Sequence, residues 1–120
     1  MFRVLVVDDE KLVRWTLKNS LENAGYAATA VEDADTAIRI LKTGDFELVI
    51  SDVKLIGMSG LELLSHIRQT RPGLPVILIT AYGNDNMRQE ARSRGAAAFF
   101  DKPFDVESLL DRVEDLCKSQ

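Results

Sequence analysis

The chain has 120 residues, of which 46% are hydrophobic and 28% are charged, and its net charge is −4. This length predicts one domain, residues 1–120, that is large enough to bury a core. The acidic balance argues against direct nucleic-acid binding, which needs a basic face. No apolar run approaches the ~20 residues of a membrane span. A single cysteine excludes an internal disulfide. Together with the absence of a visible signal peptide, it favours a cytoplasmic setting.

Strands and helices alternate along the predicted chain. Short apolar runs bounded by turn residues predict strands over residues 2–7, 27–31, 46–51, 75–80 and 96–100. Apolar residues at helical spacing predict helices that begin near residues 11, 33, 59, 84 and 105. This alternation predicts a three-layer α/β domain, a doubly wound (βα)5 fold with a parallel five-stranded sheet.

Two of the predicted helices carry specific expectations. In the helix that follows Ser59, we expect Leu61, Leu64 and Ile67 to face inward and His66 to be exposed. The helix over residues 84–94 has the thinnest apolar face, so we expect it to be the most mobile.

Four predicted strands end in polar residues. Asp8 and Asp9 follow the first strand, and Asp52 follows the third. Thr80 ends the fourth strand, and Lys102 comes just after the fifth. Because ligands of open parallel sheets bind beyond the carboxyl ends of the strands, we expect these side chains to meet in one pocket.

Three carboxylates in one cleft would repel one another, and a divalent cation would remove that repulsion. Ligands that are all oxygen favour Mg²⁺ (or Mn²⁺), and neither the single histidine nor the single cysteine lies at a strand end. A carboxylate in such a site can attack phosphorus. Lys102 could then neutralise phosphoryl oxygens and Thr80 could donate a hydrogen bond to them. An acid at a helix N-terminus is the simpler explanation for Asp8 or Asp9 alone.

The motifs at the strand ends are those of a known family. They are Val6-Val-Asp-Asp-Glu10, Ser51-Asp52 with Gly57-Met-Ser-Gly60, Ile79-Thr-Ala-Tyr-Gly83 and Phe100-Asp-Lys-Pro-Phe104. Together they resemble the receiver domain of bacterial two-component response regulators, over essentially the whole chain. The resemblance implies a flavodoxin-like strand order of 2-1-3-4-5. It also implies a phosphorylation-controlled switch and not a turnover enzyme.

The kind of receiver stays open. The residues around Trp15 resemble those of enhancer-binding, nitrogen-regulation-type transcription regulators. The runs around Thr80 and Lys102 resemble those of stand-alone relay receivers.

The resemblance also implies roles for the residues at the strand ends. Asp52 would accept a phosphoryl group from a sensor histidine kinase or a phosphotransfer protein. Asp9 and Asp52 would hold Mg²⁺ (or Mn²⁺) with the backbone carbonyl of Lys54, and Asp8 would act mainly through water. Lys102 would pair with the phosphoryl group.

Further positions of the pattern concern the switch and the loops. Thr80 would move toward the phosphoryl group, and the rotamer of Phe99 would follow it. A cis peptide bond is implied between Lys102 and Pro103. Ile56 stands where the family usually has proline.

Two bulky residues flank the predicted site at positions that vary in the family. Lys54 lies two residues after Asp52, and Tyr82 lies two residues after Thr80. We expect both to obstruct the water that would attack the phosphoryl group, and so to lengthen its lifetime.

The readout surface implied by the family comprises the fourth helix, the fifth strand and the fifth helix. Basic and acidic side chains are interspersed there: Arg88, Arg92, Arg94, Asp101, Asp111 and Asp115. This mixture could support a homodimer through complementary charge, or it could simply be a solvated surface.

Other functions are weaker readings of the same residues. An aspartate-nucleophile, Mg²⁺-dependent phosphatase would often carry a second aspartate two residues after the nucleophile, where this chain has Lys54. A flavin- or nucleotide-binding module would need a glycine-rich phosphate cradle, which is absent. A receiver that never accepts phosphate would be expected to lack some of the five polar residues at the strand ends.

Overall fold

The computed structural model describes residues 2–118, so both ends of the predicted domain, residue 1 and residues 119–120, lie outside the described residues. The strands are β1 (Arg3–Val7), β2 (Ala27–Val31), β3 (Leu48–Asp52), β4 (Val76–Thr80) and β5 (Ala98–Asp101). The helices are α1 (Lys11–Asn23), α2 (Ala34–Leu41), α3 (Gly60–Thr70), α4 (Asp85–Ser93) and α5 (Val106–Lys118). All strands are parallel, in the order β2-β1-β3-β4-β5, which confirms the predicted fold class.

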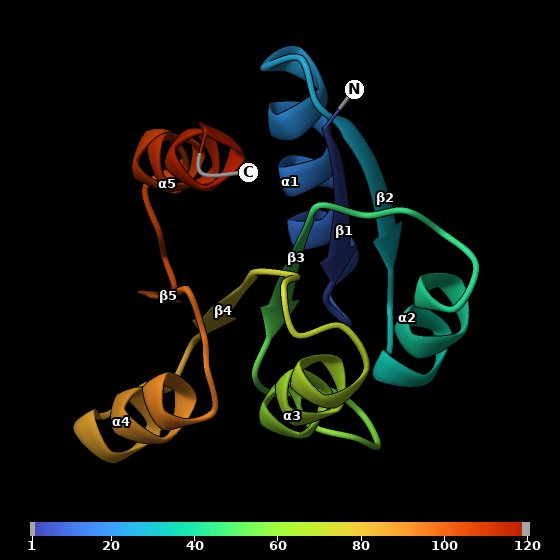
Figure 1. The fold of residues 1–120 in the computed structure, drawn as a ribbon. Coiled ribbons are helices and arrows are strands. Elements are labelled where there is room, and N and C mark those ends of the chain that lie inside the picture. Colours follow the sequence, from blue (N-terminus) through green and yellow to red (C-terminus); the bar gives the residue numbers. More distant parts are fainter. Residues whose placement is uncertain (1, 119–120) are drawn as a thin grey trace.

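The sheet separates two hydrophobic cores, because successive side chains of a strand point to opposite faces. On one face, Val4, Val6, Ile50 and Ile77 pack with residues of α1 and α5. On the other, residues such as Leu5, Val49 and Leu78 pack with α2, α3 and Ala91 of α4. Figure 1 shows α1 and α5 together on one side of the sheet and the other three helices on the opposite side. These are the three layers that the alternating pattern predicts.

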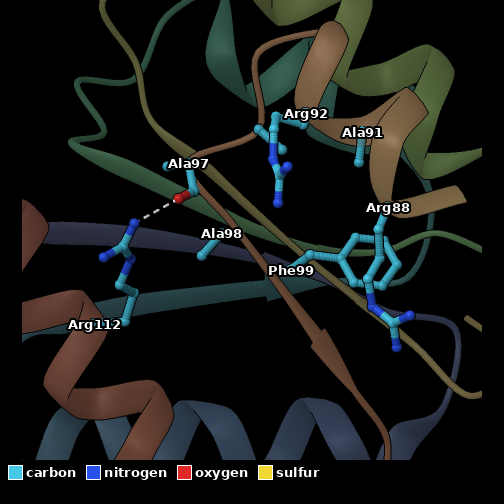
Figure 2. A pocket seen from close by; sticks show the side chains of 8 residues that line it. Arg88, Ala91, Arg92, Ala97, Ala98, Phe99 and Arg112 are labelled. Carbon is cyan, nitrogen blue, oxygen red and sulfur yellow. Dashed lines mark hydrogen bonds between the residues drawn. The ribbon is translucent and has the colours of Figure 1, made fainter. Parts of the chain in front are cut away.

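Burial is uneven across the sheet. Every residue of β3 and β4 is buried, whereas no residue of the edge strand β5 is. Outside β5, a hollow of about 340 Å³ is lined by alanines, Phe99 and the three arginines Arg88, Arg92 and Arg112. Figure 2 shows Arg88 beside the ring of Phe99 and Arg112 donating to the main-chain oxygen of Ala97. The sheet is therefore tightly packed at its centre and loosely packed along β5.

Several predicted strand limits differ from the structure by one residue, and the starts of the third and fifth strands differ by two. Phe46 is buried but precedes β3, and the chain first pairs with β1 through the Glu47 amide, which donates to the Arg3 carbonyl at 2.9 Å. The fifth strand begins at Ala98 because the Ala96 amide still donates to the Ala91 carbonyl of α4. In both cases an apolar run extends beyond the residues that pair as a strand.

The orientation of α3 corrects part of the prediction. Leu64 and Ile67 are buried as expected, but Leu63 is fully buried and Leu61 is only half-buried. His66 is also half-buried, contrary to the expected exposure, and lines a hollow of about 280 Å³ that residues of α2 and α3 share. Since α3 packs on the sheet and also beside α2, its buried arc is wider than a single helical stripe.

The fourth helix has the predicted thin apolar face, with Ala91 as its only buried residue. Arg94, which follows this helix, does not join the charged surface at α5. Its Nη1 donates to the Leu61 carbonyl at 3.0 Å and to Ser65 Oγ at 3.2 Å, both on α3. The long side chain thus supplies a polar attachment between α3 and the end of α4. No helix among residues 2–118 has the length and the apolar character needed to cross a bilayer.

Candidate functional site

The polar residues at the strand ends meet at one edge of the sheet. Register pairs Val7 of β1 with Ser51 of β3, and Thr80 of β4 with Asp101 of β5. Asp8 therefore follows β1 beside Asp52, and Lys102 follows β5 next to Thr80. The Lys102 amide donates to the Thr80 carbonyl at 2.7 Å.

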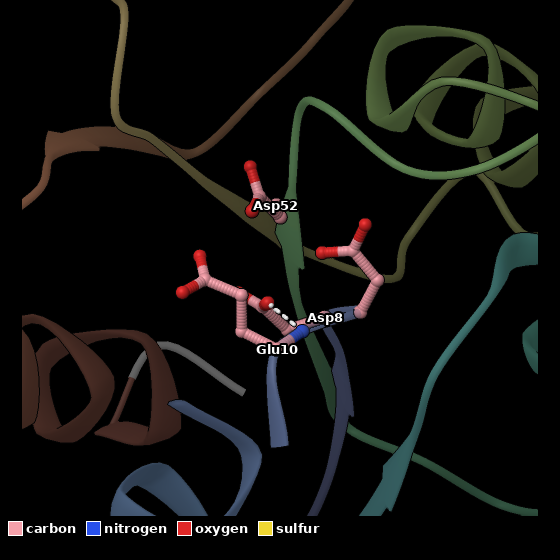
Figure 3. A group of neighbouring side chains, drawn as sticks. Asp8, Glu10 and Asp52 are labelled. Carbon is pink, nitrogen blue, oxygen red and sulfur yellow. Dashed lines mark hydrogen bonds between the residues drawn. The ribbon is translucent and has the colours of Figure 1, made fainter. Parts of the chain in front are cut away.

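Four acids form a cluster at this edge. One carboxylate oxygen from each of Asp8, Asp9, Glu10 and Asp52 lies within 4.8 Å of the others. Asp8 and Asp52 are buried, whereas Asp9 and Glu10 are exposed. Figure 3 shows the side chains of Asp8, Glu10 and Asp52 around a common space. Charges this close repel strongly where water is excluded, so the cluster requires a cation.

Lys102 supplies positive charge to the cluster. Its Nζ lies 2.8 Å from Asp52 Oδ2, 3.0 Å from Glu10 Oε1 and 3.2 Å from Asp8 Oδ2. Burial by itself would lower the pKa of Lys102. The hydrogen bonds to Asp52 and Glu10 and the charges of Asp8 and Asp52 outweigh that effect, and the pKa is raised. Lys102 is therefore a fixed cation in the resting site.

Asp8 is the most deeply placed of the acids, with no exposed surface. Burial raises its pKa. The Glu10 amide, which donates to Asp8 Oδ1 at 2.9 Å, works against that rise, and the charge of Asp52 adds to it. The main chain of Asp8 is held on both sides: its amide donates to the Val31 carbonyl at 3.1 Å, and Arg14 Nη1 donates to its carbonyl at 2.8 Å.

The loop after β3 holds the Asp52 carboxylate in place. The Lys54 amide donates to Asp52 Oδ1 at 3.1 Å. Gly57 has a φ of 84°, a conformation that favours glycine. At Gly60 the chain passes so close to the main chain of Asp52 and Val53 that a Cβ atom would collide with it. These glycines allow the loop to fold back tightly beneath Asp52.

Thr80 and Phe99 both lie beside Gly83. Thr80 is buried, and its Oγ1 accepts a hydrogen bond from the Tyr82 amide at 3.2 Å. A Cβ atom at Gly83 would lie 2.9 Å from the Thr80 methyl carbon and 3.2 Å from the Phe99 ring. Phe99 is half-buried, and the guanidinium carbon of Arg88 lies 5.7 Å from its ring centroid. Thr80 and Phe99 therefore border the same space beside Gly83.

Comparison with known proteins agrees with this arrangement. Residues 4–114 match the family model described as the response regulator receiver domain. The chain belongs to that family.

Individual relatives are consistent with the assignment. The chain is 43% identical over 111 residues to the response regulator protein FleR of Pseudomonas aeruginosa, and 36% identical over 111 residues to the DNA-binding transcriptional regulator NtrC of Escherichia coli K12. Each alignment covers 92% of this chain but 24% of the relative, so the chain spans about a quarter of these proteins. Among solved structures, it is similar to the response regulator TrrA of Thermotoga maritima in complex with Mg²⁺–BeF. The identity is 35% and the TM-score is 0.88, with 97% of this chain and 99% of that one covered.

Membership of the family settles the class of function. Receiver domains are signalling switches and not turnover enzymes, and they interact with histidine kinases or phosphotransfer proteins. They bind Mg²⁺ at an acidic pocket, and in this receiver four acids cluster at the carboxyl ends of the strands. All its ligand groups are oxygens, the kind that Mg²⁺ prefers.

Two side chains form the outer rim of the receiver site. A cavity of about 120 Å³ opens beside Asp52, and Lys54 and Tyr82 are among the residues that line it. Lys54 Nζ lies 5.6 Å from the centroid of the Tyr82 ring, and both residues are exposed. Two bulky side chains in cation–π contact therefore line the cavity beside Asp52.

The structure brings together the residues singled out in the sequence: Asp8, Asp9, Asp52, Lys54, Thr80, Tyr82, Phe99 and Lys102 all lie at this edge or pack directly behind it. The peptide bond between Lys102 and Pro103 is cis, as the resemblance implies. Sequence reasoning assigned no role to Glu10. The signal that could have found it is its place directly after Asp9, before the first turn of α1.

Proposed function

We propose that this receiver accepts a phosphoryl group on Asp52, in a Mg²⁺-dependent reaction, from a histidine kinase or a phosphotransfer protein. The proposal takes the receiver unit to be residues 1–120. The observation that carries it is the position of Lys102, whose ammonium group bridges Asp8 and Asp52 beside an open cavity. A lysine in that position can exchange its ion pair with the Asp52 carboxylate for an ion pair with a phosphoryl group attached to Asp52.

The reaction forms one bond and breaks one. A carboxylate oxygen of Asp52 bonds to phosphorus while the bond from phosphorus to the donor's imidazole nitrogen breaks, and that nitrogen keeps the electron pair. The Lys54 amide holds Asp52 Oδ1, so Oδ2 is the oxygen that faces Lys102 and the cluster. Lys102 then donates a hydrogen bond to a phosphoryl oxygen. The lysine therefore keeps an anionic partner within the site.

Asp8, Asp9 and Asp52 would hold Mg²⁺ (or Mn²⁺), with the backbone carbonyl of Lys54 as a further ligand. The metal would supply positive charge to the phosphoryl oxygens. The donor set fits, since the four clustered acids carry up to four negative charges against the single charge of Lys102. The Mg²⁺–BeF complex of TrrA supports the same assignment by similarity.

The response would begin at Thr80. Its hydroxyl would leave the Tyr82 amide to donate to the phosphoryl group, and Phe99 would move into the space beside Gly83. Phe99 lines the hollow outside β5, so its movement would alter a surface made by α4, β5 and α5 (Figure 2). We propose this surface as the readout, and as the interface of a homodimer.

The donor protein would dock over the mouth of the site. Of the exposed large hydrophobic side chains described, Leu12, Ile56 and Tyr82 lie just after the carboxyl ends of β1, β3 and β4. A partner that delivers a phosphohistidine to Asp52 must cover this edge of the sheet. Apolar groups around the mouth would favour that contact.

Lys54 and Tyr82 would set the lifetime of the phosphoryl group, because the water that hydrolyses it must pass them. Replacing both, Lys54→Ala with Tyr82→Ala, should speed dephosphorylation. A rate that stays the same or falls would count against this role.

The central experiment is mass spectrometry after incubation with acetyl phosphate and Mg²⁺. The native chain should gain one phosphoryl group, and Asp52→Asn should gain none. Asp111→Asn, which removes an exposed acid from α5, is the matched control and should behave like the native chain. Modification of Asp52→Asn at the native rate would refute the proposal. Failure of the native chain to gain a phosphoryl group would refute it equally.

A further inference from the structure

Lys102 has no free hydrogen-bond donor in the resting site. A lysine ammonium group carries three N–H bonds. Its three acceptors here are Asp8, Glu10 and Asp52, at 3.2, 3.0 and 2.8 Å. A phosphoryl oxygen can gain a hydrogen bond from Lys102 only if one of these partners gives way.

The three partners differ in how easily they can be released. The side chain of Asp8 is fully buried and that of Asp52 is 6% exposed, whereas that of Glu10 is 61% exposed. Released Asp8 would be a buried charge without a partner, which is costly. Asp52 is the proposed acceptor itself. Glu10 can turn into water, and ion pairs with an exposed partner contribute little to stability.

Glu10 also lines the mouth of the site. Its carboxylate shares the cavity of about 120 Å³ with Asp9, Asp52 and the rim residues. It adds a negative charge where an anionic phosphoryl group would enter. Glu10 therefore opposes phosphoryl transfer in two ways, by occupying Lys102 and by its charge.

We propose that Glu10 is a positioning residue that restrains Lys102 in the resting receiver and must release it before Lys102 can bind the phosphoryl group. The inference rests on the proposed function of Asp52. In this receiver, Glu10 slows phosphorylation by restraining the lysine, and it leaves the acceptor chemistry intact. The residue at position 10 therefore sets how readily the resting site can be phosphorylated.

Two variants separate the restraint from simple repulsion. Glu10→Gln removes the charge and weakens the bond to Lys102. Glu10→Asp keeps the charge but is one carbon too short to hold the same contact. Glu32→Gln is the control for net charge, because Glu32 is exposed after β2 at the same edge of the sheet and makes no described contact with Lys102.

The rate of phosphorylation by acetyl phosphate is measured at saturating Mg²⁺ for all four chains. An exposed ion pair is weak, so we expect Glu10→Gln and Glu10→Asp each to react about two- to fivefold faster than the native chain. Glu32→Gln should react at the native rate. A second readout needs no phosphate: in metal-free protein, nitrogen-15 NMR of the Lys102 ammonium group should show faster hydrogen exchange in both Glu10 variants.

The outcomes distinguish the two proposals. A native chain that takes up no phosphoryl group overturns the proposed function and the restraint with it. A native chain that reacts, with Glu10→Asp no faster and its Lys102 exchange unchanged, overturns the restraint alone. An equal acceleration in Glu32→Gln would also overturn it, because net charge would then explain the effect.

Discussion

The centre of the sheet and its β5 edge are built differently. β3 and β4 are buried along their whole length, and β3 carries Asp52 at its end. β5 has no buried residue, and its neighbour α4 buries only Ala91. A site that must hold charges in fixed positions thus stands on the rigid part of the fold. Phe99 and α4, which would respond after Thr80, lie on the less buried part, where local rearrangement costs least.

Lys102 links these two regions, because it follows β5 but pairs with Asp52 of β3. Lys102→Ala would leave Asp8 and Asp52 as buried acids without their cation. We expect it to lower the free energy of unfolding by about 3–5 kcal/mol at neutral pH in a metal chelator. Urea denaturation measures the loss, and added Mg²⁺ should restore part of it. A variant as stable as the native chain would mean that the site tolerates its charges without Lys102.

The packing difference can be tested on two neighbours in the sheet, Leu78 of β4 and Phe99 of β5. Leu78 is fully buried, so Leu78→Ala should cost about 2–5 kcal/mol. Phe99→Ala removes a larger side chain but should cost less than Leu78→Ala, because Phe99 is only partly buried at the edge of the sheet. Urea denaturation of both variants gives the comparison. Equal losses would show that the β5 edge is packed as firmly as the centre.

A substitution in the loop beneath Asp52 is expected to have an effect of intermediate size on stability. A Cβ atom at Gly60 would meet main-chain atoms of Asp52 and Val53, which cannot turn aside. Gly60→Ala should therefore cost about 1–3 kcal/mol and weaken Mg²⁺ binding by displacing Asp52. Gly73→Ala is the matched control, since nothing lies within 4 Å of a Cβ atom there. Thermal melts and Mg²⁺ titrations should show that Gly60→Ala is less stable and binds Mg²⁺ more weakly than Gly73→Ala. Identical behaviour of the two variants would contradict the close approach of Gly60 to the main chain of Asp52 and Val53.

The smallest expected effect is a gain in stability. Burial raises the pKa of Asp8 above its ordinary 3.8, so the folded chain binds this proton more tightly than the unfolded chain. Stability from this group is therefore present below pH 3.8 and lost as the pH rises through the raised value. At pH 7, Asp8→Asn should melt at a higher temperature than the native chain, and the difference should shrink on acidification. Asp45→Asn, a substitution at an exposed residue, is the control and should show no such trend. If Asp8→Asn melts at a lower temperature than the native chain at pH 7, the predicted destabilising effect of the Asp8 charge is wrong.

Much of the site could be predicted because each functional side chain follows an apolar strand. Asp8, Asp52, Thr80 and Lys102 are polar residues at the ends of such runs, and parallel strands bring their ends to one edge. The strand order itself came from the resemblance, because periodicity carries no information on which strands are neighbours.

What could not be predicted depends on contacts between elements. Glu10 looks like an ordinary acid before a helix until Lys102, distant in sequence, is placed beside it. Leu61 and His66 were assigned by helical phase alone, which does not include the contact of α3 with α2. Arg94 was grouped with the charges near α5 by sequence proximity, but its side chain extends to α3.

The contact of Arg94 has a mechanical consequence for α4. This helix is tethered to α3 at its C-terminal end by Arg94, and Gly95 rests against the Arg68 side chain there. At its other end Asn84 and Asp85 are exposed, next to the loop that leaves Thr80. A helix that is held at one end is expected to tilt about that end and not to shift along its axis. A disturbance that starts at Thr80 would tilt α4 about its C-terminal end, so the displacement offered to a partner would be largest near Asn84 and smallest near Ser93.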